Sequence, residues 1–173
     1  MKYLIASDFH GDNDSFDMFK DIISLEQPNA IYLLGDLINS YDYIYFNNTF
    51  SNVFVPIIVV AGNCDDEYTL SKLNVGYKGI YTYELINNRA LFFTHGHIYN
   101  DFEKPLGMGN KDILFMGHKH IPSIQNKKTG IFVCVGSMSR PRGGSKQSYC
   151  LFEDNVIKIK ELYTQNIINE LII

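Results

Sequence analysis

The chain of 173 residues is 46% hydrophobic and 20% charged, the composition of an ordinary globular protein, and we expect a single domain over residues 1–173. The formal net charge of −4 leaves no basic surface of the size that nucleic-acid binding requires, so no nucleic-acid partner is expected. Three scattered cysteines give no disulfide framework, and the sequence shows neither a signal peptide nor an apolar run approaching about 18 residues, so we expect a cytoplasmic protein without a membrane partner.

The first half of the chain predicts alternating strands and helices. A strand over 3–6 precedes a helix in which Phe16, Phe19, Ile22 and Ile23 recur at helical spacing. Further elements follow in chain order: a strand over 30–34, a loose helix over 42–52, a buried strand over 55–60 and a short helix over 67–73. This order is the βαβαβ pattern of a parallel sheet.

The loose helix is unusually aromatic. Its surroundings contain Tyr41, Tyr43, Tyr45, Phe46 and Phe50. Two interpretations are open: these rings form part of the core, as buried aromatics usually do, or they line a substrate pocket.

The second half of the chain is mostly β. Residues 80–94 predict an antiparallel hairpin with its turn at Asn87-Asn88. A short or broken helix is expected over 102–111, because this segment holds Pro105 and two glycines. Further strands are predicted over 113–116, 131–135, 148–152 and 156–162, and the apolar tail 166–173 docks on the body or on a second subunit. The pattern predicts an α/β fold with two packed mixed β-sheets flanked by helices.

Five apolar runs end in side chains that can bind metal ions. They lead into Asp8-Phe9-His10, Gly35-Asp36, Gly62-Asn63-Cys64-Asp65, His95-Gly96-His97 and Gly117-His118-Lys119-His120, which contain all five histidines of the chain. In an α/β sheet the carboxyl ends of the strands converge on one crevice, and Asp8 and His10 point the same way if the strand continues through them, as do His118 and His120. Imidazole, carboxylate and amide groups gathered in this way predict a site for two divalent cations.

The order of these motifs resembles that of the calcineurin-like metallophosphoesterase superfamily, and the short chain is most similar to its small bacterial and archaeal phosphodiesterase branch. The resemblance extends from residue 1 to about residue 163. It implies the αββα sandwich of that superfamily and the hydrolysis of small phosphodiesters.

The resemblance also implies two sets of metal ligands that share one carboxylate. The first ligand group is Asp8, His10, Asp36 and His120, and the second ligand group is Asp36, Asn63, His95 and His118. A hydroxide that bridges the two cations would be the nucleophile, and Asp8, Asp36 and Asn63 would take part in catalysis through the metal centre. Mn²⁺ is the expected ion, and Ni, Fe, Co or Zn would also suit these ligands.

Cys64 departs from the wider superfamily. Many members have a histidine at this position, which is thought to protonate the leaving oxygen. A thiol is a poor substitute for that acid, so a catalytic role for Cys64 is weak, and a role as covalent nucleophile is not expected because the bridging hydroxide already fills it.

Substrate contacts are expected from His97, Arg140 and Arg142. By resemblance the first histidine of His95-Gly96-His97 is the ligand, which leaves His97 beside the metals or facing the substrate. The loop holding the two arginines follows Cys134-Val135-Gly136-Ser137, where the branch usually has Asn-Pro before Gly-Ser. The two guanidinium groups either clamp a phosphate or belong to a solvated turn.

Two other functions remain as alternatives. A retromer subunit of this fold is a non-catalytic scaffold, but it lacks the histidine that this chain has at His10, and unfilled polar ligands would be costly to bury. A phosphomonoesterase is the second alternative, although Cys64 and the absence of an insertion that would build a pocket favour a diesterase. The partner is therefore a small phosphoester, and a homo-oligomer (dimer or tetramer) is possible.

Overall fold

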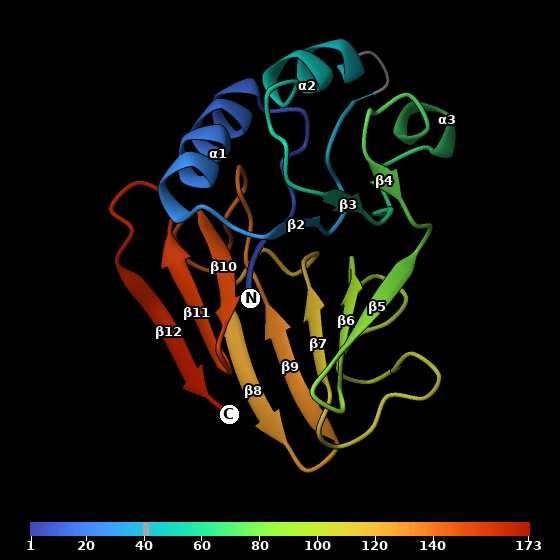
Figure 1. Ribbon diagram of the computed structural model, residues 1–173, viewed down its shortest axis with the longest axis vertical. Helices are drawn as coiled ribbons and strands as arrows, with labels where there is room; N and C mark the ends of the chain where they lie inside the picture. Colours follow the sequence, from blue (N-terminus) through green and yellow to red (C-terminus); the bar gives the residue numbers. More distant parts are fainter. Residues whose placement is uncertain (40–41) are drawn as a thin grey trace.

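Two β-sheets pack face to face in the computed structural model, which describes residues 1–39 and 42–173 (Figure 1). The seven-stranded sheet has the order β12-β11-β10-β1-β2-β3-β4. Its strands are β1 (Lys2–Ala6), β2 (Ala30–Leu33), β3 (Ile57–Val59), β4 (Gly76–Tyr77), β10 (Ser148–Glu153), β11 (Val156–Glu161) and β12 (Ile167–Ile172). Strands β1 to β4 are parallel, and β10 pairs with β1 in the antiparallel direction.

The second sheet has five strands in the order β5-β6-β7-β9-β8. These are β5 (Tyr81–Ile86), β6 (Arg89–Thr94), β7 (Ile113–Met116), β8 (Ser123–Lys127) and β9 (Gly130–Cys134). The neighbours β6, β7 and β9 are parallel, whereas β5 and β8 are antiparallel edge strands. Both sheets are therefore mixed, and the predicted fold class is confirmed.

The helices cover the outer face of the seven-stranded sheet (Figure 1). They are α1 (Asn13–Glu26), α2 (Tyr43–Thr49) and α3 (Glu67–Leu70). Helix α1 begins at Asp12, whose side chain accepts a hydrogen bond from the Ser15 amide at 3.0 Å, and ends at Gln27 in the left-handed conformation. Its apolar stripe, predicted from the spacing of Phe16 and its partners, is buried against the sheet.

The central strand β1 is buried on both faces. Leu4 and Ala6 face the helices, whereas Tyr3 and Ile5 face the second sheet. Between the sheets the Tyr32 ring stacks on Phe93, which joins β2 to β6. This packing holds the carboxyl ends of the parallel strands of both sheets in fixed positions.

The aromatic side chains of α2 belong to the core. Phe46 and Phe50 are buried and pack against Phe16, and Tyr43 and Tyr45 pack partly buried against the same cluster. The core interpretation of these four rings is confirmed. Tyr41 lies outside the described residues.

Several predicted elements differ from the structure. Helix α2 is shorter than 42–52 and α3 is shorter than 67–73, while the segment 102–111, for which a short or broken helix was expected, consists of turns and bends. The short strand β4 and the polar edge strand β8 were not predicted. The apolar tail docks on the body, because β12 pairs antiparallel with β11. In the described part of the chain, no helix combines the length and apolar composition needed to cross a bilayer.

Candidate metal centre

The polar residues that follow β1, β2, β3, β6 and β7 meet at one end of the two sheets. Each of these residues has a polar atom within 4 Å of a polar atom of another. Three groups of three residues have potential ligand atoms that all lie within 4.8 Å of one another. The residues so gathered are Asp8, His10, Asp36, Asn63, Cys64, His95, His118 and His120.

Left-handed backbone conformations direct several of these side chains toward the centre. The φ angle is +60° at Asp8, +50° at His10, +49° at Asp36, +65° at His118 and +57° at His120. The strand does not continue through Asp8 and His10, because β1 ends at Ala6, and β7 likewise ends at Met116, before His118 and His120. The condition given for a shared direction of these pairs is therefore not met, and the turns bring the side chains together instead. Short polar residues tolerate this region better than most, and here it turns successive ligands toward one point.

Two glycines beside the ligands are required because neighbouring loops approach them closely. A Cβ added to Gly62 would overlap the carboxylate and backbone of Asp36, and one added to Gly117 would overlap Ser7 and the carboxylate of Asp8. The loops therefore pass one another at distances that only glycine permits.

The first ligand group is centred on Asp8. Its Oδ1 lies 3.1 Å from Nε2 of His120 and 3.9 Å from Nε2 of His10, while the two imidazole nitrogens are 3.4 Å apart. Asp8 is fully buried, and its Oδ1 has no hydrogen-bond partner. A buried, unsatisfied carboxylate oxygen that faces two imidazole nitrogens fits a cation well.

The second ligand group is centred on Nε2 of His95. This atom lies 3.1 Å from Oδ1 of Asn63, 3.3 Å from Nδ1 of His118 and 3.4 Å from Oδ2 of Asp36. The same Oδ2 of Asp36 lies 3.9 Å from Nε2 of His10. Asp36 thus stands between the two groups, where a shared ligand would have to be.

Backbone carbonyls orient two of the imidazole rings. Nδ1 of His95 lies 2.7 Å from the carbonyl of Leu34, and Nδ1 of His120 lies 2.6 Å from the carbonyl of Arg140. Because a carbonyl only accepts, each Nδ1 carries the proton and each Nε2 presents its lone pair to the centre when the ring is neutral.

The carboxylate of Asp36 is held in its charged form. Burial opposes ionisation, but contact with the His95 ring and a hydrogen bond from the Cys64 amide hold the pKa of Asp36 well below its usual range. Burial lowers the pKa of His10 and of His118, so both rings favour the neutral form that binds metals. For His120, contact with Asp8 raises the pKa against the effect of burial.

Cys64 lies at the mouth of the centre with its side chain exposed. The thiol is nevertheless partly shielded from water, and this desolvation together with its hydrogen bond to Asp36 raises the pKa of Cys64 to about 11. Its sulfur, together with ligand atoms of His10 and Asp36, forms one of the compact subsets. The thiol therefore lies beside Asp36 and His10.

His97 and the two arginines lie around this centre. The His97 ring is 5.3 Å from that of His95 and 6.3 Å from that of His118, outside the three compact subsets, and burial lowers the pKa of His97. Arg140 and Arg142 are exposed, yet the charge of Arg140 lowers the pKa of His10 and that of Arg142 lowers the pKa of His120, in both cases after larger effects. The role of these three side chains in substrate contact stays a prediction.

Asp65 is a functional residue to which the sequence analysis gave no role. Its carboxylate accepts hydrogen bonds from the amides of Asp36 at 2.7 Å, Leu37 at 2.9 Å and Gly62 at 2.8 Å. It thereby ties the loop after β2 to the loop after β3. The available signal was its place as the last residue of Gly62-Asn63-Cys64-Asp65.

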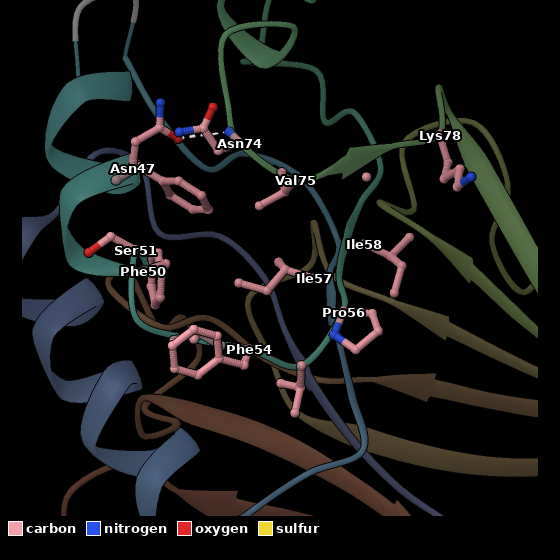
Figure 2. Close-up of a pocket in the computed structure, with 14 residues that line it drawn as sticks. Asn47, Phe50, Ser51, Phe54, Pro56, Ile57, Ile58, Asn74, Val75 and Lys78 are labelled. Atoms are coloured by element: carbon pink, nitrogen blue, oxygen red, sulfur yellow. Dashed lines mark hydrogen bonds between the residues drawn. The ribbon is translucent and has the colours of Figure 1, made fainter.

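A separate pocket of about 750 Å³ opens between α2 and the β3–β4 edge. Figure 2 shows its apolar floor, with Ile57 and Val75 between Phe50 and Ile58, and the Asn47–Asn74 hydrogen bond at its rim. None of the predicted metal ligands or substrate contacts lines it, but Phe46 and Phe50 of the aromatic segment do. The metal centre is therefore distinct from this cavity.

Comparisons with known proteins agree with this geometry. The family described as the calcineurin-like phosphoesterase superfamily domain matches residues 1–155. The phosphodiesterase YfcE of Escherichia coli strain K12 is 27% identical over 182 residues, which cover 100% of this chain and 98% of the relative. A solved structure of the E. coli phosphoesterase YfcE aligns with a TM-score of 0.88 at 26% identity over 100% of both chains. A Vps29 structure from Entamoeba histolytica aligns with a TM-score of 0.66 at 18% identity, covering 99% of this chain and 98% of that one, and shows the shared fold.

Replacement of Asp65 should damage the site without touching a ligand. Asp65→Ala leaves three backbone amides without their acceptor, so we expect a loss of about 2–5 kcal/mol in the free energy of unfolding, measured by urea denaturation. The neighbouring Asp66→Ala is the matched control, because it removes only the exposed cap of α3. Equal losses in the two variants would contradict the role assigned to Asp65.

Proposed function

The chain belongs to the calcineurin-like phosphoesterase superfamily, and from that membership we propose that it hydrolyses small phosphodiesters at a centre of two divalent cations. The resemblance predicted from the motifs is confirmed, and so is the prediction of a phosphoester hydrolase. The observation that carries the two-cation proposal is the position of Asp36, whose Oδ2 faces His95 on one side and His10 on the other.

The donor atoms of both groups suit divalent cations. Asp8, His10, Asp36 and His120 would hold the first ion, and Asp36, Asn63, His95 and His118 would hold the second. When bound, the two cations lower the pKa of a coordinated water and neutralise negative charge that develops on the phosphate.

The protein's own residues supply orientation and charge. Asp36 is held anionic and therefore can serve both ions, while the carbonyls of Leu34 and Arg140 fix the rings of His95 and His120. His97, Arg140 and Arg142 surround the centre and would contact the phosphodiester. Arginine can bind two phosphate oxygens at once, which would fix the substrate for in-line displacement.

Mn²⁺ is the ion we propose, with Fe, Co, Ni or Zn as alternatives, because imidazole and oxygen ligands accept all of them and availability selects among them. A cytoplasmic location and a homo-oligomeric state, dimer or tetramer, remain proposals from the sequence.

A non-catalytic scaffold is the rival function, since Vps29 has the same fold. Fold alone does not decide between them. The complete set of ligands, with His10 in contact with His120 and near Asp8, favours the enzyme. A phosphomonoesterase is disfavoured because Cys64 offers no effective acid for a poor leaving group.

The two-cation centre can be tested by metal content and activity together. Protein stripped with a chelator should lose hydrolysis of a nitrophenyl phosphodiester and melt at a lower temperature, and excess Mn²⁺ should restore two ions per chain with the activity. Asp36→Ala should lose both ions, whereas His10→Asn should mainly weaken one. Elemental analysis of the reconstituted protein provides the count, and one ion or none in the wild type would overturn the proposal.

With a thiol at position 64, the rate of phosphodiester hydrolysis should depend steeply on the pKa of the leaving group. Without an imidazole acid, phenolates of low pKa should leave readily and alkoxides poorly, since a well-placed general acid contributes roughly 10²–10⁴-fold. Cys64→His should accelerate poor leaving groups more than good ones, while Cys64→Ser and Cys64→Ala should change the aryl diesterase rate little. The measurement is a leaving-group series at saturating Mn²⁺. A hundredfold loss in Cys64→Ala on the nitrophenyl diester would show a direct role for the thiol.

A further inference from the structure

We propose that Ser137 is a positioning residue that places two members of the first ligand group, Asp8 and His120, through a single hydroxyl, and thereby sets the affinity of the first cation in particular. The proposal rests on the proposed two-cation function. Ser137 follows β9 and is completely buried. Its hydroxyl contacts backbone groups on both sides of the centre and no predicted ligand side chain.

The donor side of the hydroxyl holds Asp8. Ser137 Oγ donates to the Asp8 carbonyl at 2.9 Å, and Ser139 Oγ donates to the same carbonyl at 3.0 Å. The Met138 amide donates to the neighbouring Ser7 carbonyl at 3.0 Å. Asp8 adopts the left-handed conformation, which is not the intrinsic preference of its backbone. These bonds therefore fix the peptide from which the Asp8 carboxylate reaches the centre.

The acceptor side of the same hydroxyl holds His120. The Arg140 amide donates to Ser137 Oγ at 2.9 Å, and the Arg140 carbonyl accepts the Nδ1 proton of His120 at 2.6 Å. A serine hydroxyl offers one donor and two acceptor lone pairs, so it can bind the Asp8 carbonyl and the Arg140 amide together. Ser137 thus fixes the residue whose carbonyl orients the His120 ring.

The second ligand group depends on other anchors. His95 is oriented by the Leu34 carbonyl, and the loops of Asp36 and Asn63 are joined by Asp65. The groups are connected through the shared Asp36, whose carbonyl accepts from the His10 amide at 2.8 Å, and through the His118 amide, which donates to Oδ2 of Asp8 at 3.0 Å. Loss of the Ser137 hydroxyl should consequently weaken one cation strongly and the other slightly.

The experiment compares Ser137→Ala with two other buried or half-buried serines. Ser139→Ala removes a donor to the Asp8 carbonyl but keeps the hydrogen bond from the Arg140 amide to Ser137 Oγ. Ser148→Ala is the matched control, because Ser148 is equally buried and its hydroxyl donates only to the Val135 carbonyl, at 2.9 Å. Each full-length protein is stripped of metal and titrated with Mn²⁺ by isothermal calorimetry, with the melting temperature of the metal-free form measured alongside.

We expect two ions in the wild type, and in Ser137→Ala a loss of about 10–100-fold in the affinity of one ion, with the other changed by less than about threefold. Ser139→Ala should show the same selectivity with a smaller loss, and Ser148→Ala should bind both ions as the wild type does. In a His10→Asn background, Ser137→Ala should leave the remaining ion unaffected, which identifies the weakened ion as the first.

The possible failures are distinguishable. If the wild type binds fewer than two ions, the proposed function falls and the inference with it. If the wild type binds two ions and Ser137→Ala binds both unchanged, or if Ser137→Ala and Ser148→Ala weaken both ions alike, only the role of Ser137 is refuted. Should Ser137→Ala fail to fold, Ser139→Ala decides: selective weakening of one ion supports the role, and unchanged affinity for both overturns it.

Discussion

The candidate site depends on a backbone constraint at the strand ends, where five ligand residues adopt left-handed conformations. For a residue other than glycine this region costs about 1–2 kcal/mol, so each loop must be held by contacts outside itself. The loops after β1 and β2 provide such contacts for one another: the Asp8 amide donates to the Gly35 carbonyl at 3.1 Å, and the His10 amide to the Asp36 carbonyl at 2.8 Å. The ligand residues are therefore held in place by contacts of the fold itself.

Hydrogen bonds to the backbone, rather than between ligand side chains, carry most of this support. Asp65 joins three amides of the loops after β2 and β3, and Ser137 joins the Asp8 carbonyl to the Arg140 amide. Such bonds leave Oδ1 of Asp8, Oδ2 of Asp36 and the Nε2 atoms of His10, His95 and His120 facing the centre. A site built in this way concentrates negative charge and lone pairs, which bound cations stabilise.

Sequence periodicity predicted the elements with one face in the core. The strand at 3–6, the helix around Phe16 and the strand at 113–116 all have apolar spacing that burial imposes. Strand β8 was not predicted because its sequence, SIQNK, is mostly polar. It is an edge strand that pairs with β9, and its sequence has no hydrophobic alternation that would indicate a strand. In the segment 102–111, Pro105 and the glycines prevent a helix. Met108 is the residue of this segment that belongs to the core cluster on the outer face of the five-stranded sheet.

For the site, too, the sequence pattern predicted which residues come together but not the geometry in which they do so. The order of the motifs was sufficient to indicate which residues would meet, because strand ends in this class of fold converge. It could not reveal how they meet, since the left-handed turns and the backbone contacts of Asp65 and Ser137 arise from loops that approach only in three dimensions. An acidic residue in a loop, such as Asp65, or a serine after a strand, such as Ser137, has many ordinary uses in a sequence.

The pair His10 and His120 separates a metal enzyme from a scaffold on physical grounds. Their Nε2 atoms face one another at 3.4 Å, and Nδ1 of His120 already holds its proton against the Arg140 carbonyl. Neutral rings in this arrangement gain little from each other beyond one poor hydrogen bond, and two charged rings repel. A charged His120 would be paired with Oδ1 of Asp8 at 3.1 Å, but Nε2 of His10 would then face it only at the longer distance. The side chain of His10 is also only 10% exposed, so its polar nitrogen has limited access to water. His10, His120 and Asp8 would hold a cation, and such a cation would remove both difficulties. A scaffold with no need of the ion could avoid them by a single substitution of His10.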